Sequence, residues 1–265
     1  PPGPWGSEAL LQSRLPDAVA TELAVRARQD RVRVLLLRRP DRPETAERHC
    51  YVVFSGRPAT SIEHRLITDP RELLDLDLSP LRRGGPVGFG EPWDEPLYLV
   101  CTNGRHDPCC AQLGRPVIRA LLDQPTAWEC SHVGGDRFAG NLVCMPHGLY
   151  FGRVGPDSAV RVVDAYAQGT IDLDHYRGRA GDPFPVQAAE YFLRRAERIL
   201  SVDDLVPGAR RRLGDNLVEV DFAGPDGHYS VQVGLRSARP PRPLTCAAIS
   251  QERPPEYFLV SLRAG

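Results

Sequence analysis

The N-terminal part of the chain shows one helical and two strand-like hydrophobic patterns. Residues 7–29 carry apolar side chains at roughly helical spacing, although Pro16 interrupts the pattern. Two runs of apolar and β-branched residues follow at 31–39 and 48–56, and each is bounded by Pro, Asp or Gly, as strands usually are. This part of the chain therefore predicts a helix followed by two strands.

A short helix and a long connection precede the centre of the chain. Residues 69–81 predict the helix, with Asp69 as its cap and Pro70 in its first turn. Residues 82–96 are rich in Gly and Pro and have no periodicity. We expect a boundary or a long surface connection there.

The centre of the chain predicts a compact α/β unit in the order strand, helix, strand, hairpin. A buried-type strand ends near Cys101, and the hairpin turns at Pro146 to Gly148. The four elements are predicted over residues 97–103, 111–123, 126–133 and 142–154. This is the order of a thioredoxin-like domain.

Helices and then strands are predicted for the rest of the chain. Residues 156–169 have an Asp157 start and a Gly169 stop, and residues 182–200 form a longer helical pattern. The chain closes with a predicted hairpin over 216–236 and a strand over 256–263.

These patterns predict an α/β fold in which a thioredoxin-like domain is embedded in a larger mixed α/β chain. We expect an N-terminal α/β region over 1–95, the thioredoxin-like domain over 96–200 and a β-rich region over 201–265. A chain of 265 residues and 29.3 kDa can bury a substantial core without disulfide bonds.

Composition narrows the range of partners. The formal net charge of -1 disfavours nucleic acid and anionic membranes as partners, and no apolar run approaches the ~20 residues of a membrane span. We therefore expect a cytoplasmic protein. All 33 basic residues are arginine, with 24 Gly and 26 Pro, which we interpret as a high-GC bacterial origin.

Seven cysteines in a reducing compartment are better explained as ligands or redox groups than as disulfides. Three of them fall within "CTNGRHDPCC", residues 101–110. Cys50 and Cys246 stand alone in apolar contexts, where we expect ordinary core packing.

Four side chains form the candidate site. Cys101 and Cys110 stand on either side of an eight-residue loop, so that their sulfurs can converge on one metal. His132 and Asp136 are four residues apart, and the two glycines between them permit positive φ angles and a close approach of the backbone.

The segments "CTNGRHDPCC", "HVGGDRFAGNLVCMPHGLYFGRV" and "HYRGRAGDPFPVQAAEYFLRRAE" resemble the sucrase/ferredoxin-like family over roughly residues 97–198. The resemblance implies a thioredoxin-like domain that binds a 2Fe-2S cluster through two cysteines and two histidines. Position by position it implies Cys101, Cys110 and His132 as ligands, and it places Asp136 where the second histidine would be.

The fourth ligand stays open at this point. Asp136 has the family's position, whereas Cys144 offers the chemically preferred thiolate, and His147 and Cys109 are further alternatives. Cys130 is better explained as core packing than as a ligand.

Three functions compete. The resemblance implies an electron carrier that needs a reductase and an acceptor as partner proteins. A thioredoxin-like thiol–disulfide redox protein is the second, although the chain has no C-x-x-C motif. A structural zinc site is the third, because two cysteines with histidine and aspartate also satisfy tetrahedral zinc.

Overall fold

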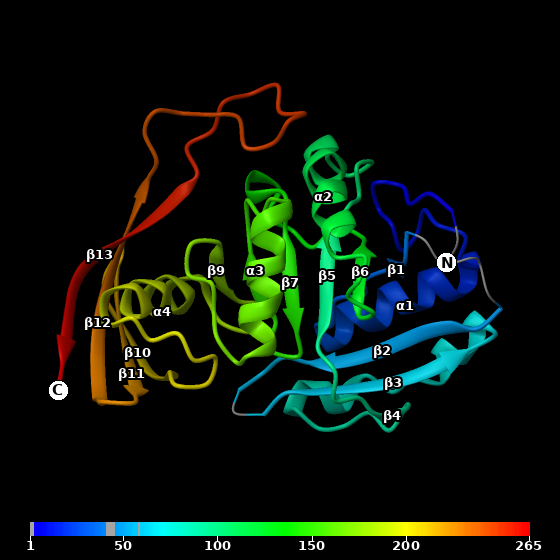
Figure 1. Ribbon diagram of the computed structural model, residues 1–265, viewed down its shortest axis with the longest axis horizontal. Helices are drawn as coiled ribbons and strands as arrows, with labels where there is room; N and C mark the ends of the chain where they lie inside the picture. Colours follow the sequence, from blue (N-terminus) through cyan, green and yellow to red (C-terminus); the bar gives the residue numbers. More distant parts are fainter. Residues whose placement is uncertain (1–2, 41–45, 58) are drawn as a thin grey trace.

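A six-stranded mixed sheet lies at the centre of the protein (Figure 1). The computed structural model describes residues 3–40, 46–57 and 59–265. In this sheet the strand order is β1-β6-β5-β7-β8-β9, with β5 and β6 parallel and the other pairs antiparallel. Its strands are β1 (Leu37–Arg38), β5 (Leu97–Cys101), β6 (Ala127–Cys130), β7 (Leu142–Met145), β8 (Leu149–Phe151) and β9 (Tyr176–Arg179).

Strand β5 is apolar on both faces because both are covered. Tyr98 and Val100 pack beneath helices α2 (Pro108–Ala120) and α3 (Pro156–Ala167). Leu97, Leu99 and Cys101 point to the opposite face and pack with β2 and β3 side chains. This explains why the sequence of β5 is a continuous hydrophobic run rather than an alternating one.

A second, three-stranded sheet covers part of that opposite face. It contains β2 (Arg48–Phe54), β3 (Ser61–Ile67) and β4 (Glu91–Pro92). Next to it lie helix α1 (Asp17–Asp30) and two 3-10 segments, η1 (Pro70–Asp75) and η2 (Ser79–Arg83).

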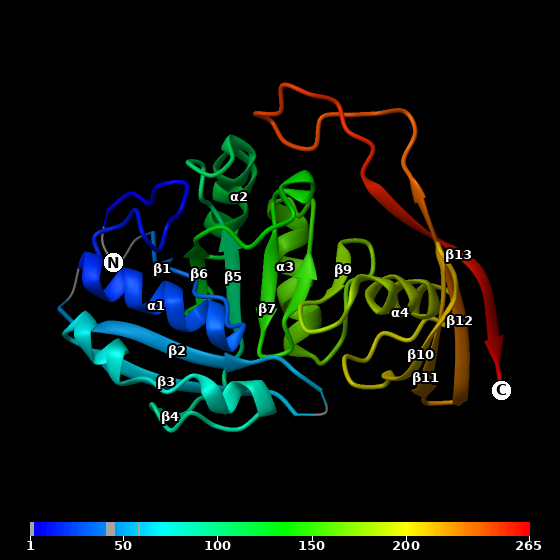
Figure 2. The same ribbon diagram turned by 180° about the vertical axis from the view of Figure 1, so that it is seen from behind.

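The C-terminal part forms a four-stranded antiparallel sheet against helix α4 (Phe184–Glu197) (Figure 1). Its strands are β10 (Val206–Gly214), β11 (Leu217–Gly224), β12 (Gly227–Ser237) and β13 (Pro255–Ala264). Between β12 and β13, residues 239–253 leave this sheet and reach back over the central sheet towards α2, as both ribbon views show (Figures 1 and 2). We call this segment the C-terminal loop.

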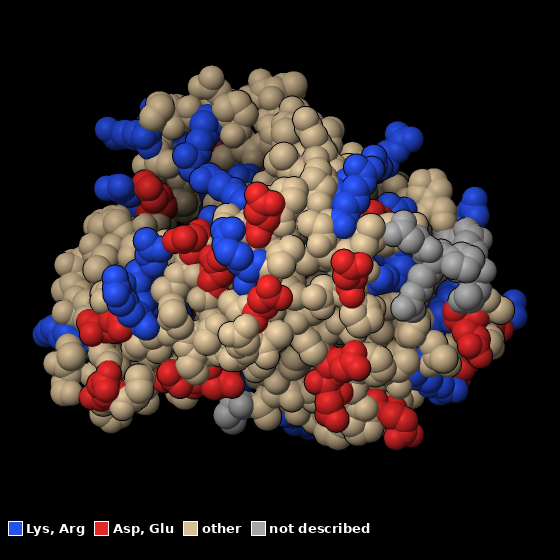
Figure 3. Space-filling model, viewed as in Figure 1, with Lys and Arg blue, Asp and Glu red and all other residues tan. Residues whose placement is uncertain are grey.

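A buried ion-pair network lies near the junction of α4 with the central sheet. Glu190 and Arg194 on α4 are fully buried and paired at 2.9 Å, and Arg57 contacts the other oxygen of Glu190 at 2.8 Å. On the surface, in contrast, basic and acidic side chains are interspersed over the face in Figure 3. This mixture agrees with the net charge near zero.

The mixed α/β class expected from the sequence is confirmed, and so is the order strand, helix, strand, hairpin at the centre. Two local predictions were wrong. Residues 31–39 contribute only the two-residue β1, and residues 69–81 form two 3-10 segments instead of a helix, although Asp69 does cap the first. Strands β3, β4, β9 and β10 were not predicted.

Candidate metal centre

The two candidate cysteine ligands come from the end of a strand and the start of a helix. Cys101 is the last residue of β5, and Cys110 lies in the first turn of α2. Asp107 caps that helix by accepting the N–H of Cys109, and Pro108 follows at the first helical position. At Gly114 a Cβ atom would lie 2.1 Å from the Cys101 carbonyl oxygen, so glycine allows α2 to pack directly onto β5.

The other two candidate ligands lie on the loop between β6 and β7. Gly134 and Gly135 both adopt positive φ, at 87° and 73°, and turn the chain so that Asp136 follows His132 back towards the cysteines. The buried Asn141 side chain donates to the carbonyl oxygens of both glycines, at 3.2 and 3.0 Å. The loop is thus held in one shape by hydrogen bonds.

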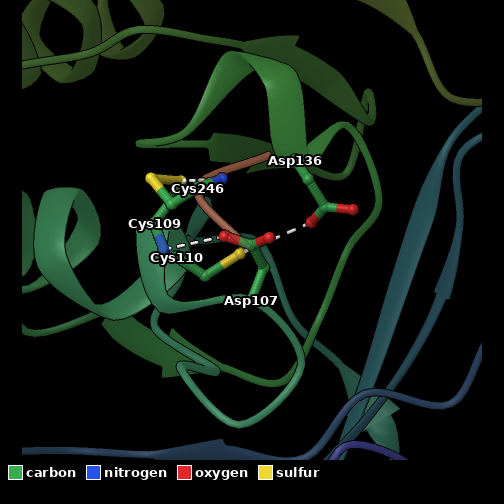
Figure 4. Close-up of a disulfide and its surroundings, with 5 residues drawn as sticks. All are labelled: Asp107, Cys109, Cys110, Asp136 and Cys246. Atoms are coloured by element: carbon green, nitrogen blue, oxygen red, sulfur yellow. Dashed lines mark hydrogen bonds between the residues drawn. A yellow bond between two sulfur atoms is a disulfide. The ribbon is translucent and has the colours of Figure 1, made fainter. Parts of the chain in front are cut away.

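These elements bring the four side chains together. His132 Nδ1 lies 3.9 Å from both the Cys101 and the Cys110 sulfurs and 3.3 Å from Asp136 Oδ1. The Cys110 sulfur also contacts Asp136 Oδ1 at 3.6 Å (Figure 4). Donor atoms of Cys101, Cys110 and His132 all lie within 4.8 Å of one another, so these groups could hold a metal ion.

The His132 ring is oriented by its backbone. Its Nε2 accepts the N–H of Gly134 at 3.0 Å, which leaves Nδ1 facing the sulfurs and Asp136. In a neutral ring the proton is then on Nδ1. A neutral ring that binds a metal ion through Nδ1 must carry its proton on Nε2, so metal binding here would require the Gly134 N–H contact to Nε2 to open.

The two neighbouring thiols, Cys101 and Cys110, have pKa values that are shifted in opposite directions. A hydrogen bond from Cys110 lowers the pKa of the Cys101 thiol to about 5, with smaller contributions from His132 and nearby backbone N–H groups, and burial opposes this. The same hydrogen bond, together with burial and the Asp136 charge, raises the pKa of Cys110. The hydrogen bond therefore favours the thiolate form of Cys101, and thiolates are the form that binds metals.

A fifth side chain belongs to this cluster and was missed in the sequence. The His106 ring stacks on the His132 ring, with 3.6 Å between centroids, and its Nε2 lies 3.9 Å from Asp136 Oδ2. His106, His132 and Asp136 form a second group that could hold a metal ion. The sequence signal that could have identified His106 is its position in the loop between Cys101 and Cys110.

The alternative fourth ligands lie elsewhere. Cys144 on β7 is fully buried on the helix-covered face of the sheet, opposite to the face that carries Cys101. His147 lies in the turn between β7 and β8, where its Nδ1 contacts the Tyr166 hydroxyl at 2.6 Å. Cys130 is fully buried in the core, as expected.

Cys109 is not a free thiol. It forms a disulfide with Cys246 in the C-terminal loop, 137 residues away (Figure 4). Cys246 is exposed, so the expectation that it packs in the core was wrong, and Cys109 departs from the expectation that the clustered cysteines are ligands or redox groups rather than disulfides. Cys50, also expected in the core, is only half-buried on β2.

Curated relatives match part of the chain, and three of them, from different fungi, are named Altered inheritance of mitochondria protein 32. The protein from Eremothecium gossypii is 32% identical over 111 residues, covering 36% of this chain and 36% of the relative. The protein from Meyerozyma guilliermondii is 34% identical over 96 residues, covering 31% and 34%. The Saccharomyces cerevisiae protein is 29% identical over 105 residues, covering 34% of each. The chain thus spans about a third of the length of these relatives.

These findings correct two expectations. The relatives are not named as electron-transfer ferredoxins, and the family name does not establish an iron–sulfur role, so electron transfer by an iron–sulfur protein is not supported as the function. The bacterial origin inferred from composition is not supported either, because these relatives are fungal.

Three further findings concern the chain as a whole. In the described part of the chain, none of the helices has both the length and the apolar character that crossing a membrane requires. No solved structure matches the chain. A family model does match, over residues 11–178, which is more than half of the sequence. The chain belongs to the sucrase/ferredoxin-like family.

Proposed function

We propose that this chain is a metal-binding protein whose centre is held by Cys101, Cys110 and His132, with Asp136 as the fourth donor. The observation that supports this is the convergence of two sulfurs, an imidazole nitrogen and a carboxylate oxygen at contacts of 3.3–3.9 Å. The donors come from three separate elements, β5, α2 and the loop after β6.

The separations and the chemistry of the four donor groups fit a bound metal ion. Bonds of about 2.0–2.3 Å to a tetrahedral ion place its ligand atoms roughly 3.3–3.8 Å apart, close to the separations found here. Both cysteines are almost fully buried, and a buried thiolate such as Cys101 is stabilised by an opposite charge. A thiophilic metal supplies that charge.

The proposal has a finer form, in which the occupant is a 2Fe-2S cluster. In its favour, the donors fall into a cysteine group and a His106–His132–Asp136 group that share His132, so that the two cysteines could serve one iron and two of the other donors the second. A single zinc ion is the alternative, favoured by the short separations. Either occupant supplies positive charge to the thiolates, and neither by itself assigns a reaction to the protein.

The chain's own residues would prepare the site. Asn141 fixes the glycine pair after His132, and the helix packing at Gly114 sets the separation of the two sulfurs. Such supporting contacts typically change metal affinity by 10–100-fold when they are removed.

The test is the metal and acid-labile sulfide content of protein reconstituted anaerobically with zinc, or with iron and sulfide. We expect stoichiometric zinc, or two irons and two sulfides, in the wild-type protein. Cys110→Ser and His132→Ala should each lower the affinity at least tenfold, whereas Cys50→Ser, a cysteine outside the site, should bind like the wild type.

Two outcomes would overturn the proposal. One is a wild-type protein that binds none of these metals. The other is retention of wild-type affinity by both site variants. Circular dichroism of each variant separates loss of the site from loss of the fold.

The location stays part of the proposal. A cytoplasmic protein is what the sequence favours, while the name of the relatives refers to inheritance of mitochondria. Fractionation of cells that express the full protein distinguishes a cytoplasmic from an organellar location.

A further inference from the structure

The C-terminal loop is tied to the rest of the protein at one place. Among the described residues, the only hydrogen bond from residues 239–253 to a residue outside the loop runs from the Cys246 N–H to Cys109 Sγ, at 2.9 Å. The disulfide joins the same two residues. The loop's other hydrogen bonds are internal, such as the pair that joins Arg242 and Glu252.

This attachment closes one side of a cleft beside the candidate metal centre. The cleft has a volume of ≈ 170 Å³ and is lined by Cys109, Asp136 and Arg137 on one side and by loop residues 243–246 on the other. Figure 4 shows the disulfide and the contact between Cys110 and Asp136 around the same turn of α2. The loop therefore covers the surface next to Asp136.

Electrostatics favours opening of this cleft. The positive charge of Arg137 beside the cleft interacts with those of Arg242 on the loop and of Arg153. The loop is thus held against a repulsion between like charges. Its tip is also fully solvated, since Ile249 is completely exposed.

We propose that Cys109 and Cys246 form a reversible thiol–disulfide pair that fastens the C-terminal loop over this cleft, and that reduction of the pair by a dithiol releases the loop. The placement of the disulfide does not depend on the proposed metal. Only the consequence, access to Asp136 beside the centre, rests on the proposed function.

The two sulfurs are suited to different steps of the exchange. Cys246 is exposed, so the thiolate of a dithiol attacks Cys246 Sγ and forms a mixed disulfide. Cys109 is the leaving group. Its thiolate is stabilised by the Cys246 N–H and by its place in the first turn of a 13-residue helix.

The second thiol of the reductant completes the reaction. It attacks the reductant's own sulfur in the mixed disulfide and releases the Cys246 thiolate. The dithiol loses two electrons and two protons and becomes a disulfide, and Cys109 and Cys246 gain them as two thiols. A disulfide oxidant reverses both steps.

The test treats the folded wild-type protein with dithiothreitol at neutral pH, blocks free thiols with iodoacetamide and locates the label by mass spectrometry. We expect label on Cys109 and Cys246 only after dithiothreitol, with an unchanged circular dichroism spectrum. Removing dithiothreitol and adding oxidised glutathione before blocking should prevent the label again.

Release of the loop has its own readout. Trypsin is unsuitable because Arg239, Arg242 and Arg253 each precede proline, but elastase can cut at Ala247 and Ala248. We expect cleavage there to be about tenfold faster in reduced and blocked wild type and in Cys246→Ser than in oxidised wild type. Cys50→Ser should match the oxidised wild type, because Cys50 lies outside the pair.

Three results would overturn the inference. They are label on Cys246 without any reductant, a disulfide that is reduced only after unfolding, and equal cleavage of oxidised wild type and Cys246→Ser. Metal content measured on the same samples keeps the two proposals apart. A protein that binds no metal but shows the expected labelling and cleavage would overturn the metal centre alone.

Discussion

Replacing Gly114 with alanine would push α2 away from the strand that carries Cys101. The new Cβ atom would lie 2.1 Å from the Cys101 carbonyl oxygen, whereas ordinary contact begins at 3.4 Å. The helix must therefore move by about 1.3 Å, because β5 is held between β6 and β7 and cannot yield. The same movement displaces Cys110 from Cys101.

The energetic cost follows from two opposing effects. Overpacking costs about 1–3 kcal/mol and more when backbone is the obstacle, and the better helix propensity of alanine returns up to about 1 kcal/mol. We expect a net loss of about 2 kcal/mol, which for a chain of this size lowers Tm by about 4–8 °C. Metal affinity should fall as well, since the two sulfurs no longer converge.

The assay compares thermal unfolding and metal affinity of Gly114→Ala with those of Gly85→Ala. At Gly85 the nearest atom to an added Cβ is 3.6 Å away, so that variant should unfold within about 0.5 kcal/mol of the wild type. If the two alanine variants unfold at the same temperature and bind metal equally well, the close packing of α2 on β5 does not set the site.

Two further predictions concern buried charge. Glu190→Gln leaves the buried Arg194 without its counter-charge and should lower the free energy of unfolding by about 3–5 kcal/mol in urea, and a loss below 1 kcal/mol would contradict the network. Because Cys101 binds fewer protons when folded than when unfolded between pH 5 and 9, stability of the metal-free protein should rise with pH in that window, and a falling curve would refute the assignment.

The central elements could be predicted from the sequence because their patterns are local. A strand buried on both faces, such as residues 97–101, is a continuous apolar run, and the turn at Pro146 to Gly148 marks its own hairpin. Helix α2 begins earlier than expected because Asp107 and Pro108 form its start, the same Asp-Pro signal that did locate the cap at Asp69.

Other strands were missed because their patterns carry no such signal. In β3, the buried Glu63 breaks the alternation, and its carboxylate accepts the backbone N–H groups of Val87 and Phe89. In β9, Arg179 is buried and adjacent to Gly178, so the strand has little apolar character. Strand β10 has no buried residue.

In the candidate site too, features that depend on residues close in sequence could be predicted, and features that depend on distant residues could not. Cys101, Cys110, His132 and Asp136 lie in two short segments, so their spacing suggested that they meet. The face on which Cys144 lies depends on strand register, which the sequence did not provide. The Cys109–Cys246 pairing joins residues 137 positions apart, and no local pattern connects them.

X-ray absorption at the edge of the bound metal tests the metal centre most directly, because it reports the atoms bonded to the metal in the intact protein. We expect sulfur ligands together with nitrogen or oxygen ligands, and loss of part of the sulfur signal in Cys110→Ser. A coordination shell of nitrogen and oxygen alone, or one that Cys110→Ser leaves unchanged, would contradict a centre held by Cys101, Cys110 and His132.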